Sequence, residues 1–123
     1  MIIKTFKDLM VWQEDHKLVI MVYKLTQKFP KSELFGLVSQ MRRAVISITS
    51  NLAEGFGRRT YKDRMQFYYV SQGSSTELKN QLLVAKDIGY TNNVEYQEIE
   101  KQADHTHRLL QGLITKTHQF IKS

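Results

Sequence analysis

Residues 34–64 read LFGLVSQMRRAVISITSNLAEGFGRRTYKDR, and their apolar positions follow the period of a helix. These positions recur in steps of three and four, so at about 100° per residue they share one face. The face consists of Leu37, Met41, Ala44, Ile48 and Leu52. The spacing predicts a helix near residues 35–56 that packs this face into a core.

The same segment carries a narrow polar stripe opposite the apolar face. Its members are Gln40, Arg43, Ser47, Ser50, Asn51, Glu54 and Arg58. Apolar residues flank the stripe on both edges, whereas the outer face of a surface helix is polar over about half of the cylinder. We therefore predict an internal polar network. Its members are Arg43, Asn51, Glu54 and, from the next helix, Glu77. The alternative is a solvated face with pairs such as Glu54 and Arg58.

Three further segments have helical periodicity, and short turns separate all four. The predicted helices lie near residues 8–28, 35–56, 61–88 and 94–121. Phe29-Pro30 ends the first because the residue before proline disfavours the α region, and Gly55 with Gly57 permits left-handed geometry at the end of the second. Without a Gly/Ser-rich linker, the pattern predicts one domain over residues 1–123, an all-α, antiparallel up-down four-helix bundle.

The first predicted helix carries two neighbouring apolar rows. Together they span about 160°, more than the ~100° that packing on one neighbour requires. We predict that part of this surface contacts another subunit of a homo-oligomer. The predicted interface residues are Val11, Leu18, Val22 and Leu25. The alternative is a wide stripe that is buried wholly inside the monomer.

Composition limits the classes of function. The chain has 123 residues and no cysteine, which excludes disulfides, thiolate metal sites and a cysteine nucleophile. The longest apolar run, residues 18–23, is far shorter than the ~18 residues of a membrane span, and the N-terminus lacks the apolar region of a signal peptide. We expect a cytoplasmic protein that does not contact a membrane.

The net charge of +6 is concentrated in the first half of the chain. Residues 1–64 hold twelve Lys and Arg against six Asp and Glu, while residues 65–123 hold six against six. This asymmetry favours an acidic partner, of which nucleic acid is the commonest.

The histidines and serines do not form a pattern typical of catalysis. His105 and His107 lie two residues apart, roughly 200° around a helix, so they cannot share a metal ion. His16 falls in an apolar row and is expected to be a buried, hydrogen-bonded histidine. Ser47 and Ser50 lack a base at helical spacing that would activate them. We predict no catalytic residues, no metal and no cofactor.

The best candidate for a functional surface is the turn between the second and third helices. Its basic residues are Arg58, Arg59, Lys62 and Arg64, with Tyr61, Tyr68 and Tyr69 nearby. Clusters of this kind contact phosphates, and aromatic rings stack on unpaired bases. The alternative is an ordinary solvated turn whose tyrosines pack in the bundle.

Several segments carry a family resemblance. They are FKDLMVW, VYKLTQKFP, FGLVSQMRRAVISITSNLAEGFGRR, QGSSTELKNQL and DIGY, in this order over nearly the whole chain. The sequence resembles the bacterial four-helix bundle proteins first noticed as products of intervening sequences in 23S ribosomal RNA genes. The resemblance implies a ring of five subunits. Relatives include the accessory proteins of diversity-generating retroelements, which bind nucleic acid and a reverse transcriptase.

Two hypotheses of different classes follow. The first is a non-enzymatic oligomeric binding module whose basic turns engage RNA or DNA, with a nucleic-acid enzyme as a further partner. The second is a structural assembly protein that scaffolds a protein partner without binding nucleic acid. An enzyme ranks below both, because the sequence offers neither a nucleophile with its base nor a metal shell.

Overall fold

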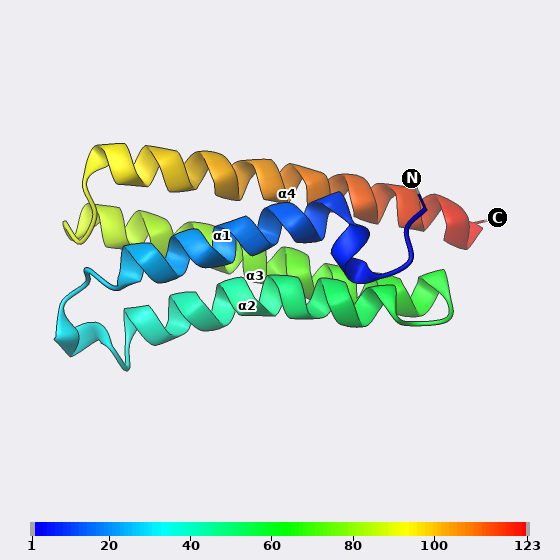
Figure 1. The fold of residues 1–123 in the computed structure, drawn as a ribbon, viewed down its shortest axis with the longest axis horizontal. Coiled ribbons are helices and arrows are strands. Elements are labelled where there is room, and N and C mark those ends of the chain that lie inside the picture. The colour runs from blue at the N-terminus through cyan, green and yellow to red at the C-terminus, as the bar shows by residue number, and fades with distance from the viewer. Residues whose placement is uncertain (1, 123) are drawn as a thin grey trace.

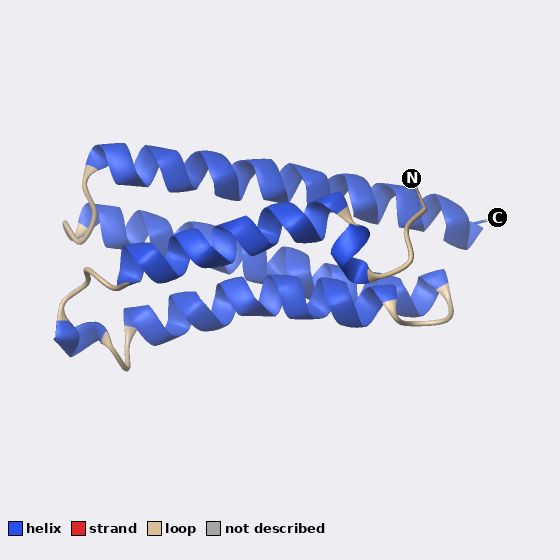
Figure 2. Cartoon of the chain, viewed as in Figure 1, coloured by secondary structure: helices blue, strands red, loops and turns tan. Residues whose placement is uncertain are grey.

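The computed structural model describes residues 2–122, and it confirms the predicted all-α four-helix bundle. The helices are α1 (Met10–Thr26), α2 (Leu37–Phe56), α3 (Tyr61–Asp87) and α4 (Asn93–Lys122), and no strand occurs among these residues (Figure 2). Each helix runs antiparallel to the next, α1 packs against α2 and α4, and α3 packs against the same two helices (Figure 1). The α2–α3 turn lies at the end of the bundle that holds both chain termini.

Two short 3-10 helices account for most of the difference between predicted and observed helix limits. The first, η1 (Phe6–Asp8), precedes α1, and Leu9 between them is extended at φ −73° and ψ 125°. The Asp8 carboxylate accepts the N–H groups of Lys4 and Thr5 at 2.9 and 3.0 Å, which fixes this first turn. The second, η2 (Lys31–Glu33), follows Pro30 and connects α1 to α2.

The two glycines at the end of α2 act differently from the prediction. Gly57 has φ −78°, and Gly89 is the one described residue with positive φ, at 87°, directly after the last turn of α3. Gly55 is buried inside α2, and a Cβ built there would lie 2.7 Å from a ring carbon of Tyr68. Gly55 therefore permits close approach of α3, which is a packing role.

The core runs along the centre of the bundle and receives side chains from all four helices. Its fully buried members include Leu18, Val22, Met41, Val45, Ile48, Leu52, Leu78, Leu82 and Leu110. No helix within residues 2–122 combines the length and the apolar character needed to cross a membrane. The apolar stripes predicted from the 3.6-residue period thus meet in one interior.

Candidate nucleic-acid interface

The basic turn consists of Arg58, Arg59, Lys62 and Arg64, and it joins the end of α2 to the start of α3. Thr60 caps α3, because its hydroxyl accepts the Asp63 N–H at 3.1 Å. The first N–H groups of a helix have no acceptor inside it and carry a partial positive charge. The cap thus holds the basic side chains beside a helix end that favours anions.

Two residues of the basic turn have partners within the chain. The Arg58 guanidinium lies 3.4 Å from Glu54 and 4.6 Å from the centre of the Phe67 ring. The Arg64 Nε donates to the Arg58 carbonyl at 2.9 Å, and its guanidinium lies 5.2 Å from the centre of the Phe56 ring. Both arginines therefore help to hold the turn in shape.

The other two, Arg59 and Lys62, are exposed and have no hydrogen-bond or ion-pair partner within residues 2–122. Only Thr60 and Tyr61 lie between them in the chain, so both residues are at the end of the bundle that holds the α2–α3 turn. A charged side chain without a partner in the protein does not have to break an ion pair before it binds a phosphate. These two residues are the part of the basic turn that is available to a ligand.

The three tyrosines near the turn separate into two kinds. Tyr61 and Tyr69 are exposed, whereas Tyr68 is only 2% exposed and packs against Gly55. Burial raises the pKa of Tyr68, and the nearby charge of Arg64 opposes the rise. Tyr61 stacks on Phe120 of α4, with the ring centres 4.9 Å apart. The expectation that the tyrosines pack in the bundle thus holds for Tyr68.

The predicted internal network is corrected by the structure. Arg43, Glu54 and Glu77 are all exposed, and no bond joins any of them to another among the described residues. Asn51 is half-buried, but its amide donates within its own helix, to the Ser47 carbonyl at 2.8 Å. The solvated-face alternative describes this stripe of the single chain, including the Glu54–Arg58 pair.

A shift of one helical turn explains why the prediction failed. Counting residues from the turn sets Arg43 beside Ser74. In the structure the Ser74 hydroxyl donates instead to the Ser47 hydroxyl at 2.8 Å, and the Ser71 hydroxyl donates to the Ile48 carbonyl at 2.8 Å. The turn spans the predicted residues, with α2 ending at Phe56 and α3 beginning at Tyr61, but α3 is offset along α2, so that Ser74 meets Ser47 and not Arg43. The seam between the helices holds small hydroxyl groups and no ion pair.

The predicted oligomer contacts on α1 are also corrected. The affected residues are Val11, Leu18, Val22 and Leu25. They are between 0 and 6% exposed and belong to the core of their own chain, which leaves them no surface for another subunit. The wide apolar stripe of α1 is therefore explained by burial inside the monomer.

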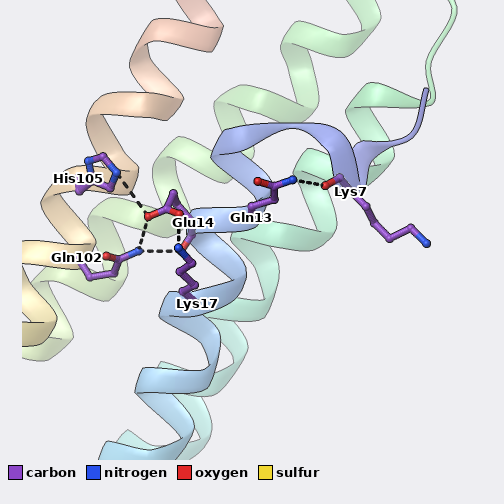
Figure 3. A network of polar contacts seen from close by, with 6 residues as sticks. All are labelled: Lys7, Gln13, Glu14, Lys17, Gln102 and His105. Carbon is purple, nitrogen blue, oxygen red and sulfur yellow. Dashed lines mark hydrogen bonds and ion pairs between the residues drawn. The ribbon is translucent and has the colours of Figure 1, made fainter. Parts of the chain in front are cut away.

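A polar cluster between α1 and α4 escaped the sequence analysis. Figure 3 shows Glu14 of α1 facing Gln102 and His105 of α4. The Gln102 amide donates to the Glu14 carbonyl at 3.0 Å, and His105 Nε2 lies 3.5 Å from Glu14 Oε1. Lys17 donates to the Glu14 carboxylate at 2.7 Å, and this hydrogen bond is the main reason that the pKa of Glu14 is lowered. Glu14 and Gln102 are 88 residues apart, so no local spacing in the sequence could have predicted their contact.

A buried carboxyl group lies one residue beyond this cluster. Asp15 is 1% exposed, and neither of its carboxyl oxygens has a hydrogen-bond partner among the described residues. Burial raises the pKa of Asp15 to about 7; the Thr106 hydroxyl opposes the rise and the Glu14 charge adds to it. Thr106 itself donates to the Ala103 carbonyl at 3.0 Å, and desolvation is the main cause of the raised pKa of Asp15.

His16 does not occupy the place expected of it. His16 is exposed and stacks on Trp12 with 4.9 Å between ring centres, so the expectation of a buried histidine is wrong. His107 instead meets a core hydroxyl, since its Nδ1 lies 2.8 Å from the Ser75 Oγ. Burial lowers the pKa of His107, with the Lys79 charge acting in the same direction.

Comparison with known proteins adds a fold relative and a family. A solved structure of a protein with unknown function from the S23 ribosomal protein family of Bacteroides thetaiotaomicron VPI-5482 superposes with a TM-score of 0.81 at 18% identity, covering 89% of this chain and 98% of that one. The comparison with curated proteins finds no match. The sequence profile of the 23S rRNA-intervening sequence protein family matches residues 7–112. The chain therefore belongs to the 23S rRNA-intervening sequence protein family.

Proposed function

We propose that this protein is a non-enzymatic, cytoplasmic, oligomeric module that binds RNA or DNA through its basic turn. One observation carries the proposal: Arg59 and Lys62 are exposed, lack partners within residues 2–122, and lie beside the capped start of α3. Cations in this position neutralise phosphates and read no bases. Binding is therefore expected to be sensitive to salt and tolerant of sequence.

The oligomer of this proposal uses a different surface from the one predicted on α1. Val70, Val84 and Ile88 are 51, 41 and 52% exposed. Their spacing places them within about 40° of one another on α3. They lie on the side of α3 next to the exposed stripe of α2, to which Ser74 is bonded. We propose that a second copy covers this face, which also carries the exposed Glu77, in a ring of five as the resemblance implies.

Oligomerisation bears directly on affinity. One turn offers two free cations, which is a weak anchor by itself. Several copies in one assembly present the same pair repeatedly, and each further contact on a bound strand is made at high effective concentration. The proposal therefore links the α3 face to the basic turn. A change that prevents assembly through α3 is expected to weaken nucleic-acid binding by the basic turns.

Fluorescence anisotropy of labelled RNA and DNA against salt concentration tests the proposed binding. We expect binding at about 50 mM salt, a linear decrease of log affinity with log salt, and similar affinities for unrelated sequences. Absence of binding at low salt contradicts the proposal.

A second candidate function is scaffolding of a protein partner. It is favoured by Leu34 and Phe35, which are 50 and 93% exposed in the α1–α2 connection, at the end of the bundle opposite the basic turn. An aromatic ring this exposed is a typical anchor of protein interfaces. The anisotropy titration against salt distinguishes the two candidate functions, because a protein scaffold shows no salt-dependent affinity for nucleic acid.

A further inference from the structure

We infer that the end of the bundle beside the basic turn holds a pocket for one unpaired nucleotide of a bound strand, with the base against the aromatic lining and its phosphate on Arg64 and Lys116. The inference rests on the proposed function and specifies its substrate as single-stranded nucleic acid.

The cavity has a volume of about 320 Å³ and lies between the start of α3, the last turns of α4 and the N-terminal segment. Its lining includes Phe56, Tyr61, Tyr68, Leu113, Phe120 and Ile3. Ligand pockets usually measure about 300–1,000 Å³ and combine apolar walls with a few polar groups. This cavity lies at the lower limit, which suits one nucleotide better than a larger ligand.

Two cationic side chains complete the lining, and they favour an anionic ligand. Arg64 and Lys116 both line the cavity. Arg64 uses its Nε for the Arg58 carbonyl, and its terminal N–H groups have no acceptor among the described residues. Lys116 is exposed and has no ion-pair partner within residues 2–122. No acidic side chain lines the cavity. A ligand that is aromatic at one end and anionic at the other matches this distribution.

The Tyr68 hydroxyl is a further polar group at the cavity. Tyr68 lines the cavity, and its hydroxyl makes no hydrogen bond within residues 2–122 although its ring packs against Gly55. The hydroxyl keeps contact with solvent, since the buried side-chain atoms without a partner among these residues belong to Asp15 and Gln81. The edge of a nucleobase carries acceptors that satisfy such a donor, whereas an aliphatic ligand does not.

The aromatic rings supply the stacking surface. Tyr61 stacks on Phe120 at 4.9 Å, and its ring centre lies 5.3 Å from the Arg64 guanidinium. Tyr61 is 44% exposed, so the ring remains accessible from the turn. A base stacked on an aromatic ring contributes about 1–3 kcal/mol, or five- to a hundredfold in affinity. Bases inside a duplex are already stacked and paired, so only an unpaired base gains this contact.

The experiment compares a labelled strand of mixed sequence with the same strand annealed to its complement, as RNA and as DNA, by anisotropy at about 50 mM salt. We expect the single strand to bind the intact protein about tenfold more tightly than the duplex. Tyr61→Ala should abolish this preference, and Tyr61→Phe should retain it. Tyr23→Ala is the matched control, because Tyr23 is an exposed tyrosine in the last turn of α1, and α1 ends at the end of the bundle opposite the basic turn. Thermal melting checks that each variant is folded.

Lys116→Ala keeps the test decisive if Tyr61→Ala does not fold, because an exposed lysine can be truncated without loss of packing. It should weaken the single strand more than the duplex. Equal affinities for strand and duplex, or variants that keep the preference, overturn the pocket while the proposed function stands. Complete displacement of the strand by AMP or UMP alone overturns the assignment to a strand. Absence of any binding overturns both proposals.

Discussion

The Ser74 hydroxyl of α3 donates to the Ser47 hydroxyl of α2 at 2.8 Å, on the side of the bundle where the charged side chains of the stripe point to solvent. This contact fixes the register of the two helices. It also separates the stripe into an inner part, with Ser47 and Asn51 half-buried, and an outer part with Arg43 and Glu54.

The first prediction concerns this outer part. Arg43→Ala and Glu77→Ala should each change the free energy of unfolding by less than about 0.5 kcal/mol, because exposed charges without partners contribute little. Urea unfolding at concentrations that favour the monomer measures this. A loss of about 3 kcal/mol in either variant would contradict this account and would indicate a buried charge network.

The second prediction concerns glycine. Gly55→Ala should destabilise the protein by about 1–3 kcal/mol, because the new Cβ would lie 2.7 Å from the Tyr68 ring and 2.9 Å from the Phe67 Cβ. Gly73→Ala, measured at concentrations that favour the monomer, is the matched control. Nothing lies within 4 Å of a Cβ there, so the better helix propensity of alanine should stabilise α3 by up to about 1 kcal/mol. Equal effects of the two substitutions on the melting temperature would contradict the packing argument.

These two sites show what the sequence could predict. The spacing of Met41, Ile48 and Leu52 is a property of one helix, so the four-helix fold and its core were predictable. A glycine inside a helix pattern indicates close approach of a neighbour, yet a Cβ on Gly73 would meet nothing within 4 Å, and it is Gly55 that a neighbouring helix meets. Which glycine a neighbouring helix meets depends on the register of the two helices, and the period within one helix does not encode the offset between two.

The third prediction concerns pH. The folded-state pKa of Asp15 is about 7 and its ordinary value is 3.8, so the folded protein binds this proton more tightly than the unfolded chain does. Its contribution to stability is therefore fully present below about pH 4, decreases as pH rises to about 7, and is then lost, at a cost of about 4 kcal/mol. Asp15→Asn should stabilise the protein by about 2–4 kcal/mol near pH 8 and have little effect near pH 4.

Unfolding free energies of both proteins across this range measure the effect. The lowered pKa of Glu14 has the opposite sign, since its stabilisation is lost only as pH falls below its ordinary value of 4.5. Its own titration therefore lies at the acidic end of this range in both proteins, and the difference above it reports Asp15 together with the neighbouring Glu14 charge. A difference that does not vary between about pH 4 and pH 8 would contradict the burial of a titrating Asp15.

The fourth prediction concerns assembly. The wild-type protein should sediment at a multiple of 14.5 kDa at micromolar concentration. Val70→Glu with Val84→Glu should yield the monomer, because burying unpaired charges in an apolar contact is costly. Gln97→Glu adds an acidic group to the exposed face of α4 and should leave the mass unchanged. A monomeric wild type would contradict the proposed oligomer, and an intact double variant would exclude this face.

The most direct test of the central claim is the salt dependence of nucleic-acid affinity in the variant Arg59→Ala/Lys62→Ala. Each lost phosphate contact should flatten the slope of log affinity against log salt by about one unit, so we predict a slope shallower by about two and a similar weakening for unrelated sequences. Lys24→Ala/Lys101→Ala removes the same charge from exposed positions outside the turn and should keep the wild-type slope. If the two double variants bind with the same affinity and slope, the basic turn is not the nucleic-acid interface.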